Sequence, residues 1–363
     1  MPQLSVWAPG KLMLMGEYAV TEPGHTGIVT AVNRGLTCRI EAASHFQLRF
    51  PGIYHGSITA PTLSGVLRQL SETPGLALAH QVLKLALRYL VEEGHGDVEP
   101  FSVIVRSDLN GANGRKLGLG SSAAFTAALL AALISYGRQA AFSWDLDPFF
   151  KLAALVYLTC QPLSSCADLA ASIYGGALAY QRFDPKWIQE RVSCGQSLHE
   201  MVETSWPYLK ICRQRLLPAA IRVGWTGMPV STPDMLERVA RYKAAHGDNY
   251  ALFLSQSEHA VQGFLQAQQP LDLFRSIGQN RAALLELGQA ADLPIETPVM
   301  KSAVDMVYRL GGAGKASGAG GGDAILAWFE SGDSDGKLFR EWGTLGVNPI
   351  PLLPSDAGIT PLL

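Results

Sequence analysis

Glycines give way abruptly to helix-forming residues in the stretch Lys116-Leu117-Gly118-Leu119-Gly120-Ser121-Ser122-Ala123-Ala124-Phe125, and the alanine- and leucine-rich run 126–133 follows. Gly118 and Gly120 allow positive φ and a close approach of the backbone to a ligand. Ser121 or Ser122 can cap the helix or hold a metal ion. The unpaired N–H groups and the positive end of the helix dipole then face the glycines, which favours a bound phosphate.

Two other interpretations of this stretch compete with phosphate binding. Its Gly-x-Gly-x-x-Ala pattern fits the dinucleotide fingerprint, but that motif follows directly on an apolar strand, whereas the polar residues 113–116 precede it here. Alternatively, the glycines and serines only begin a buried alanine-rich helix. The stretch alone supports this last interpretation and phosphate binding equally, so other segments must decide.

Length and charge limit the class of protein. The 363 residues can bury a large core and suggest two domains. The 29 Lys and Arg against 31 Asp and Glu give a formal net charge of −2 without a basic block. Neither a nucleic acid nor a membrane surface is therefore an evident partner, and a small-molecule substrate is favoured.

The cysteines and the N-terminus indicate the compartment. The five cysteines are far apart and form no Cys-x-x-Cys pair, which argues against structural zinc and against a disulfide framework. Residues 2–7 lack the basic and apolar segments of a secretion signal, and no apolar run is long enough to span a membrane. The sequence therefore predicts a cytoplasmic protein.

Apolar alternation predicts that a sheet begins the chain. We expect strands at 4–8, 28–32, 36–40 and 101–105, a break at Pro9-Gly10, and a turn at 33–35. A hairpin over 47–60 and helices over 76–93 and 148–160 are also expected. Lys11 then lies at a turn, where a lysine is usually a solvated charge, although its apolar flanks favour a functional role.

Asp168 opens a second helix-like run, which ends at 175–176 before a strand at 177–180. An aspartate at this position is also explained by capping and by the helix dipole. Apolar periodicity lapses between 190 and 207, so we divide the chain into domains 1–205 and 206–363. The second domain is predicted to contain a strand at 220–225, helices at 251–268, 271–291, 297–310 and 339–343, and an edge strand at 350–353.

A second glycine-rich segment, 311–323, precedes the apolar strand 324–329. Ordering so many glycines is costly, and a flexible linker would not run directly into a buried strand. We therefore expect a ligand-facing loop. It is not a Walker A loop, because Ala316 follows Lys315.

Three segments together resemble the motifs of the GHMP small-molecule kinases: Pro9-Gly10-Lys11 with Gly16-Glu17-Tyr18, Gly118 to Ala123, and Lys315 to Asp323. The resemblance covers nearly the whole chain. It implies an α+β fold, in which an N-terminal domain of the ribosomal-protein-S5-like fold joins a ferredoxin-like C-terminal domain. It also implies ATP and Mg²⁺ as cofactors.

The resemblance also implies site residues. It places Lys11 and Asp168 as catalytic residues at the transferring phosphoryl group, and Ser121 or Ser122 on magnesium. The implied ATP-binding residues are Lys116, Gly118, Leu119, Gly120, Ser121, Ser122 and Ala123. The implied substrate-binding residues are Lys11, Tyr18, His25, Asp168, Ser317, Gly318 and Ala319. Such a set can neutralise the moving phosphoryl group and hold two reactants in line without covalent chemistry.

Within the family, four segments are most similar to the phosphomevalonate kinase branch, which implies 5-phosphomevalonate as acceptor: 168–170, 180–184, 223–227 and 231–232. Its phosphate has a second pKa of about 6, so no strong base is required and Asp168 would orient Lys11 and the magnesium ion. An acceptor phosphate needs further cations. The candidates are His25, Arg34, Arg182 and Lys210, although solvated charge is the more usual role of such residues.

Two departures and two alternatives accompany this resemblance. Leu163 precedes Ser164 where related enzymes often have glycine, and Ala324 replaces a common cysteine. One alternative is mevalonate kinase or another GHMP kinase acting on a hydroxyl, where Asp168 would be needed more as a base. The other is a non-catalytic metabolite sensor, which the presence of Lys11 and Asp168 disfavours. A monomer and a homodimer both remain open.

Overall fold

The computed structural model describes residues 3–111, 117–140, 143, 145–228 and 232–362. The strands are β1 Leu4–Met15, β2 Thr26–Ala42, β3 Phe46–Arg49, β4 Ser57–Ala60, β5 Phe101–Ser107, β6 Ala177–Gln181, β7 Lys210–Gln214, β8 Ala220–Trp225, β9 Ala313–Ser317, β10 Ala324–Phe329, β11 Asn348–Ile350 and β12 Thr360–Leu362. The α-helices are α1 Leu63–Glu72, α2 Ala77–Glu92, α3 Ser121–Gly137, α4 Leu146–Cys160, α5 Ala167–Tyr174, α6 Pro185–Ser193, α7 Leu198–Glu203, α8 Thr232–Ala245, α9 Gly247–Gln266, α10 Pro270–Ala290, α11 Pro298–Arg309 and α12 Asp335–Thr344.

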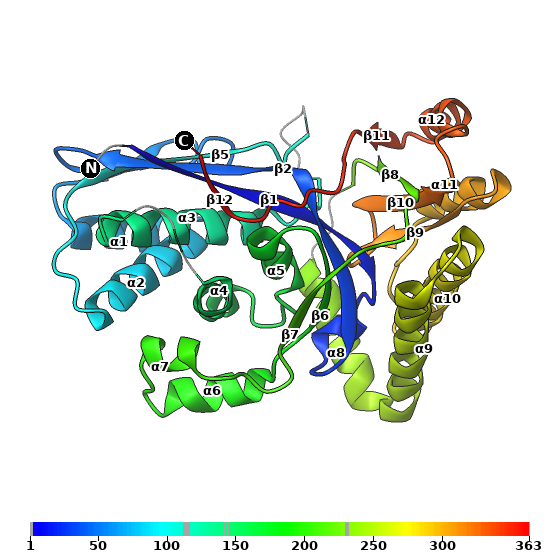
Figure 1. The fold of residues 1–363 in the computed structure, drawn as a ribbon, viewed down its shortest axis with the longest axis horizontal. Helices are drawn as coiled ribbons and strands as arrows, with labels where there is room; N and C mark the ends of the chain where they lie inside the picture. The colour runs from blue at the N-terminus through cyan, green and yellow to red at the C-terminus, as the bar shows by residue number, and fades with distance from the viewer. Residues whose placement is uncertain (1–2, 112–116, 141–142, 144, 229–231, 363) are drawn as a thin grey trace.

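The first sheet has the order β12-β1-β2-β5-β3-β4, with β6 paired to β2 and β7 paired to β6. Helices α1 to α5 lie on one side of it (Figure 1). Helix α3 packs against β1 and β2 and also against α2, α4 and α5. Every residue from Ala123 to Tyr136 is therefore buried, as expected for a helix that is apolar on all sides. The alanine-rich sequence suits this central position because small side chains allow close packing.

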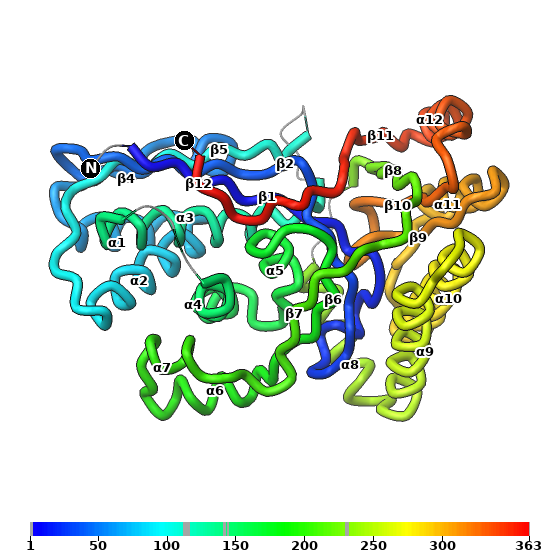
Figure 2. The backbone as a smooth tube through the Cα atoms, viewed as in Figure 1, coloured from blue at the N-terminus to red at the C-terminus, as the bar shows by residue number. Residues whose placement is uncertain are grey.

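The second sheet is antiparallel, with the order β11-β8-β10-β9, and α10 and α11 contact β9. Helices α9 and α10 pack together at the side of this sheet (Figure 1). The chain then returns to the first sheet, as Figure 2 shows, where β12 pairs with β1. The last strand thus links the C-terminal part of the chain back to its beginning.

Two predicted breaks in the first sheet are wrong. Strand β1 runs through Pro9-Gly10 with a register shift between Pro9 and Lys11, and β2 runs through the expected turn at 33–35. A bulge accommodates the proline without ending the strand. Gly10 is needed for close approach, because a Cβ there would lie 2.7 Å from the Leu119 carbonyl oxygen. Lys11 therefore projects from a strand and not from a turn.

Other predictions differ in part. The segment 311–323 is not all loop, since β9 occupies its first half and is fully buried. The lapse in periodicity at 190–207 contains the end of α6 and all of α7, and the edge strand expected at 350–353 lies at 348–350 as β11. Strand β7 extends the first sheet to residue 214, while the division at 205 and 206 stays a prediction. Helices over 76–93, 148–160, 251–268, 271–291, 297–310 and 339–343 are confirmed to within a few residues.

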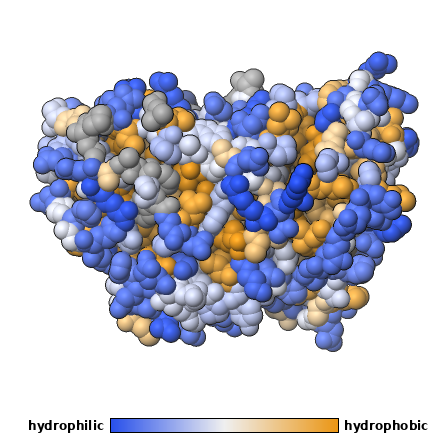
Figure 3. All heavy atoms as spheres, viewed as in Figure 1, coloured by the Kyte–Doolittle hydropathy of each residue, from blue (hydrophilic) through white to orange (hydrophobic). Residues whose placement is uncertain are grey.

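Hydrophilic and apolar residues are interspersed over the face shown in Figure 3. In the part of the chain that the structure describes, no helix combines the length and the hydropathy needed to cross a membrane.

Candidate active site

The glycine loop before α3 has the conformation that its sequence predicts. Gly118 and Gly120 have φ of +73° and +75°, and Gly120 is the residue at which the helix is capped. The buried Leu117 and Leu119 anchor the loop, and the Lys11 N–H donates to the Leu119 carbonyl oxygen at 2.9 Å. Because Gly120 has no side chain, the helix start is open above it. Lys116 lies outside the described residues.

Lys11 and Asp168 both lie beside this loop. The Lys11 Nζ donates to the Gly118 carbonyl oxygen at 3.2 Å. A Cβ on Gly120 would lie 2.9 Å from Lys11 Cγ and 3.5 Å from Asp168 Cβ, so the glycine leaves room for both side chains. Asp168 lies in the first turn of α5, where the helix dipole stabilises its negative charge.

Tyr157 on α4 fixes the Asp168 carboxylate. Its hydroxyl donates to Asp168 Oδ2 at 2.8 Å, while Oδ1 accepts from the Leu169 N–H at 3.0 Å. Burial, with the Asp168 charge as a further cause, raises the Tyr157 pKa well above its usual value, so this hydroxyl stays a donor. Sequence reasoning missed this residue. A signal was present, because a tyrosine within the apolar run 152–158 of a helix requires a partner for its hydroxyl.

The third motif is joined to the first by direct hydrogen bonds. Ser317 Oγ donates to the Met13 carbonyl oxygen at 2.9 Å, and the Tyr18 hydroxyl donates to the Ala319 carbonyl oxygen at 2.6 Å. The Asp323 side chain packs against Gly118, where a Cβ would meet it at 2.8 Å. The turn after β9 therefore contacts both β1 and the glycine loop.

These segments enclose one cavity of about 540 Å³. Predicted residues that line it are Lys11, Tyr18, Gly118, Gly120, Ser121, Ser122, Asp168, Ser317, Gly318 and Ala319. Leu119 and Ala123 are buried beneath it. Glu17 and Asp323 also line it; both stand in the quoted motifs, but sequence reasoning gave them no role. Further lining residues that sequence reasoning missed are Tyr157, Gln161 and Glu237. These three stand outside recognisable motifs, so only their spatial convergence identifies them.

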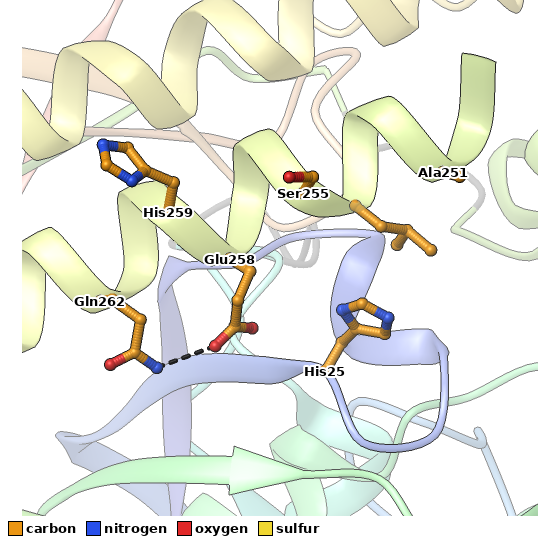
Figure 4. Close-up of a pocket in the computed structure, with 7 residues that line it drawn as sticks. His25, Ala251, Ser255, Glu258, His259 and Gln262 are labelled. Atoms are coloured by element: carbon orange, nitrogen blue, oxygen red, sulfur yellow. Dashed lines mark hydrogen bonds between the residues drawn. The ribbon is translucent and has the colours of Figure 1, made fainter. Parts of the chain in front are cut away.

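His25 is not brought to this cavity. It lines a separate hollow of about 460 Å³ against α9, with Glu258 and His259 (Figure 4). There the Glu258 carboxylate accepts from Gln262 Nε2 at 2.8 Å, and the His259 ring points away from His25. Strand β2 begins at Thr26 and fixes His25 on this side.

The other cationic candidates also lie outside the cavity lining. Arg182 is buried behind it and donates to the carbonyl oxygens of Thr21, at 2.6 Å, and Pro162, at 3.4 Å. Thr21 and Pro162 both line the cavity, so Arg182 supports two of its walls from behind. Lys210 is exposed on β7, and Arg34 lies in the middle of β2.

The charges around the cavity suit a magnesium ion that arrives with phosphates. Among the described lining residues, Lys11 is accompanied by the acidic Glu17, Asp168, Glu237 and Asp323. No group of three or more His, Cys, Asp or Glu side chains in the described ranges could hold a metal by itself. Mg²⁺ usually takes one or two carboxylates together with substrate phosphates and waters. A hydroxyl from Ser121 or Ser122 and the Asp168 carboxylate fit this pattern.

Comparison with known proteins agrees with the geometry. The family model described as the GHMP kinases N-terminal domain matches residues 78–176, and the model described as GHMP kinases C terminal matches residues 264–348. A curated phosphomevalonate kinase from Streptomyces sp. (strain CL190) is 32% identical over 376 residues, which cover 97% of each chain.

Solved structures are similar over the whole chain. The Lin0012 protein from Listeria innocua has a TM-score of 0.90 and 34% identity, with 99% of each chain covered. A Streptococcus pneumoniae phosphomevalonate kinase in complex with phosphomevalonate and AMPPNP has a TM-score of 0.84 and 22% identity, covering 96% of this chain and 99% of the other. The expected two-part α+β fold is thereby confirmed. The chain belongs to the GHMP kinase family.

Proposed function

We propose that the protein transfers the γ-phosphoryl group of ATP to the phosphate of 5-phosphomevalonate, giving ADP and 5-diphosphomevalonate. The observation that carries this proposal is the convergence of the open start of α3, Lys11 and Asp168 on one cavity. The choice of acceptor is supported by the Streptomyces relative, whose name is phosphomevalonate kinase and which matches nearly the whole chain.

The chain's own groups can hold the donor. The first N–H groups of α3 and the loop of Gly118 and Gly120 bind the triphosphate, because they offer donors and positive potential without a side chain in the way. Lys11 lies beside Gly120 and neutralises charge that builds on the moving phosphoryl group. Magnesium, held by Ser121 or Ser122 and by Asp168, would neutralise further charge and keep the phosphate oxygens in place.

The acceptor attacks with an oxygen of its own phosphate. This oxygen forms the new bond to the γ-phosphorus, and the bond from the γ-phosphorus to the bridging oxygen of ADP breaks. Since the second pKa of such a phosphate is about 6, the oxygen is largely ionised at neutral pH. Asp168 is then needed to orient Lys11 and the magnesium ion and not to remove a proton. Its hydrogen bond from the Tyr157 hydroxyl agrees with this role.

The acceptor would lie against the third motif. Tyr18, Ser317, Gly318 and Ala319 line the cavity next to Lys11, on the side of β1 that faces the second sheet. Glycine at 318, with φ of +73° and no atom within 4 Å of a Cβ position, leaves the backbone open to a ligand there. His25 has no part in this arrangement.

An acceptor panel tests the proposal. Release of ADP is measured in a coupled assay with ATP, magnesium and either 5-phosphomevalonate, mevalonate or no acceptor. We expect turnover with 5-phosphomevalonate and at most a trace with mevalonate. Turnover of mevalonate alone would show a hydroxyl kinase. Binding of ATP by calorimetry without turnover of either acceptor would contradict the kinase assignment, and Asp168→Asn serves as the inactive control.

A further inference from the structure

A buried ion pair joins the first motif to the third. Lys315 in the middle of β9 has no exposed surface, and its Nζ is paired with the Glu17 carboxylate and donates to the Ala316 carbonyl oxygen at 2.8 Å. Glu17 lies two residues after the end of β1 and is 2% exposed. The two residues are 298 positions apart in sequence, so this contact exists only because the two sheets meet here.

Asn280 brings a third segment into the same network. Its Oδ1 accepts from the Gly16 N–H at 2.9 Å, and its Nδ2 donates to Glu17 Oε2 at 3.5 Å. Asn280 lies on α10 and is 1% exposed. The end of β1, the middle of β9 and one face of α10 are therefore held by one set of polar contacts.

Stability alone is a weak explanation for this network. Burial lowers the Lys315 pKa, which shows that the ammonium ion is disfavoured at this place, and Glu17 opposes that effect. Buried ion pairs often add nothing to stability when compared with apolar side chains of similar volume, but they can specify one arrangement among several. What they specify here is the position of β9 relative to β1.

That position matters for the cavity. Two residues after Lys315, Ser317 donates to Met13, which is two residues after Lys11 on β1. One residue after Glu17, Tyr18 donates to Ala319 in the turn that follows β9. The network therefore lies directly behind the contacts that hold the turn Ser317 to Ala319 against the strand of Lys11.

We propose that Glu17, Lys315 and Asn280 form a positioning network, which sets the turn of the third motif at its working distance from Lys11. Lys315 also neutralises the charge of Glu17, which lines the cavity and would otherwise repel an anionic acceptor. The kinetic part of this inference rests on the proposed function, whereas its structural part does not depend on the acceptor.

The test is the double variant Glu17→Gln with Lys315→Met, which removes both charges together and leaves no unpaired buried ion. Its matched control is Arg222→Met with Asp335→Asn, a pair that joins β8 to α12 away from the cavity. Hydrogen exchange of peptides covering 315–323, measured without substrates, is expected to become at least 10-fold faster in the double variant. The control pair should leave it unchanged.

Steady-state kinetics give the second readout. We expect kcat/KM for 5-phosphomevalonate to fall at least 30-fold in the double variant, while KM for ATP stays within 2-fold. A purely structural role would lower the melting temperature and affect both substrates equally. Glu17→Asp keeps the charges but shortens the reach of the carboxylate. In this variant kcat/KM for 5-phosphomevalonate should fall about 5-fold, while KM for ATP stays within 2-fold.

Specific outcomes would overturn the inference. One is that hydrogen exchange of peptides covering 315–323 is unchanged in both Glu17 variants. The other is that kcat/KM falls equally for ATP and for 5-phosphomevalonate. If the double variant does not fold, Glu17→Asp decides alone. If the wild-type protein does not turn over 5-phosphomevalonate, the proposed function fails, but the exchange experiment still decides whether the network positions the turn.

Discussion

Replacing Gly120 by alanine tests whether Lys11 and Asp168 work where the structure places them. Gly120 caps α3 with φ of +75°, and an added Cβ would lie 2.9 Å from Lys11 Cγ and 3.5 Å from Asp168 Cβ. The new methyl group would therefore meet the inner part of the lysine side chain, which cannot swing away as freely as its end. We expect Gly120→Ala to displace Lys11 and to leave the fold intact.

The size of the effect follows from these distances. Ordinary carbon contacts are about 3.5–4.0 Å, so Lys11 has to move by roughly 0.6–1 Å. A misplacement of about 1 Å at a catalytic group can cost about 100-fold in rate. Alanine in the left-handed region also costs about 1–2 kcal/mol of stability. We therefore expect kcat to fall about 100-fold, together with a loss of stability of about 1–2 kcal/mol.

Gly346→Ala separates these two effects. Gly346 has the same φ of +75°, but no atom lies within 4 Å of its Cβ position, and it follows α12 outside the cavity. Both variants should lower the melting temperature by a similar amount, measured by differential scanning fluorimetry. Only Gly120→Ala should lose turnover in the coupled ADP assay at saturating substrates.

Equal activity in the two variants would refute the reasoning. If Gly120→Ala keeps kcat within about 3-fold of Gly346→Ala, a shift of Lys11 of up to 1 Å has no consequence, and the lysine is not at the reacting phosphoryl group. A large loss of stability in Gly120→Ala alone would mean instead that the clash unfolds the start of α3. Calorimetry with ATP distinguishes that case, because an unfolded helix start would no longer bind the nucleotide.

Other changes give further expected outcomes. Lys11→Met should lower kcat at least 1,000-fold in the same assay while calorimetry shows nearly unchanged ATP affinity, because the lysine acts mainly on the charge of the transition state. Tyr157→Phe should lower kcat about 10- to 100-fold, since a hydrogen bond to a charged group contributes about 1.5–3 kcal/mol; Tyr136→Phe, which removes a remote bond to Pro100, is its control. Arg182→Lys should raise KM for the acceptor but not for ATP, because it loses the fork that holds Thr21 and Pro162. Chelation of divalent ions should stop turnover, and added Mg²⁺ should restore it.

Local sequence determined much of the fold. The glycines at 118 and 120, followed by helix formers, specify a left-handed turn and a helix start, because glycine alone adopts positive φ without strain. Apolar periodicity specified most helices, because the buried face of a helix depends on residues only three and four positions apart in sequence. The breaks expected at Pro9-Gly10 and at residues 33–35 were wrong, because neighbouring strands and a bulge override a local turn preference.

The sequence also specified the three motifs, and thereby the family. It could not specify how side chains from different motifs meet. The bond from Tyr157 to Asp168, the burial of Arg182 and the position of His25 outside the cavity follow from which faces of helices and strands pack together. The pairing of Glu17 with Lys315 is a further case, because 298 residues separate the partners. A contact at that separation is decided by the packing of two sheets and one helix, and no local pattern of residues encodes it.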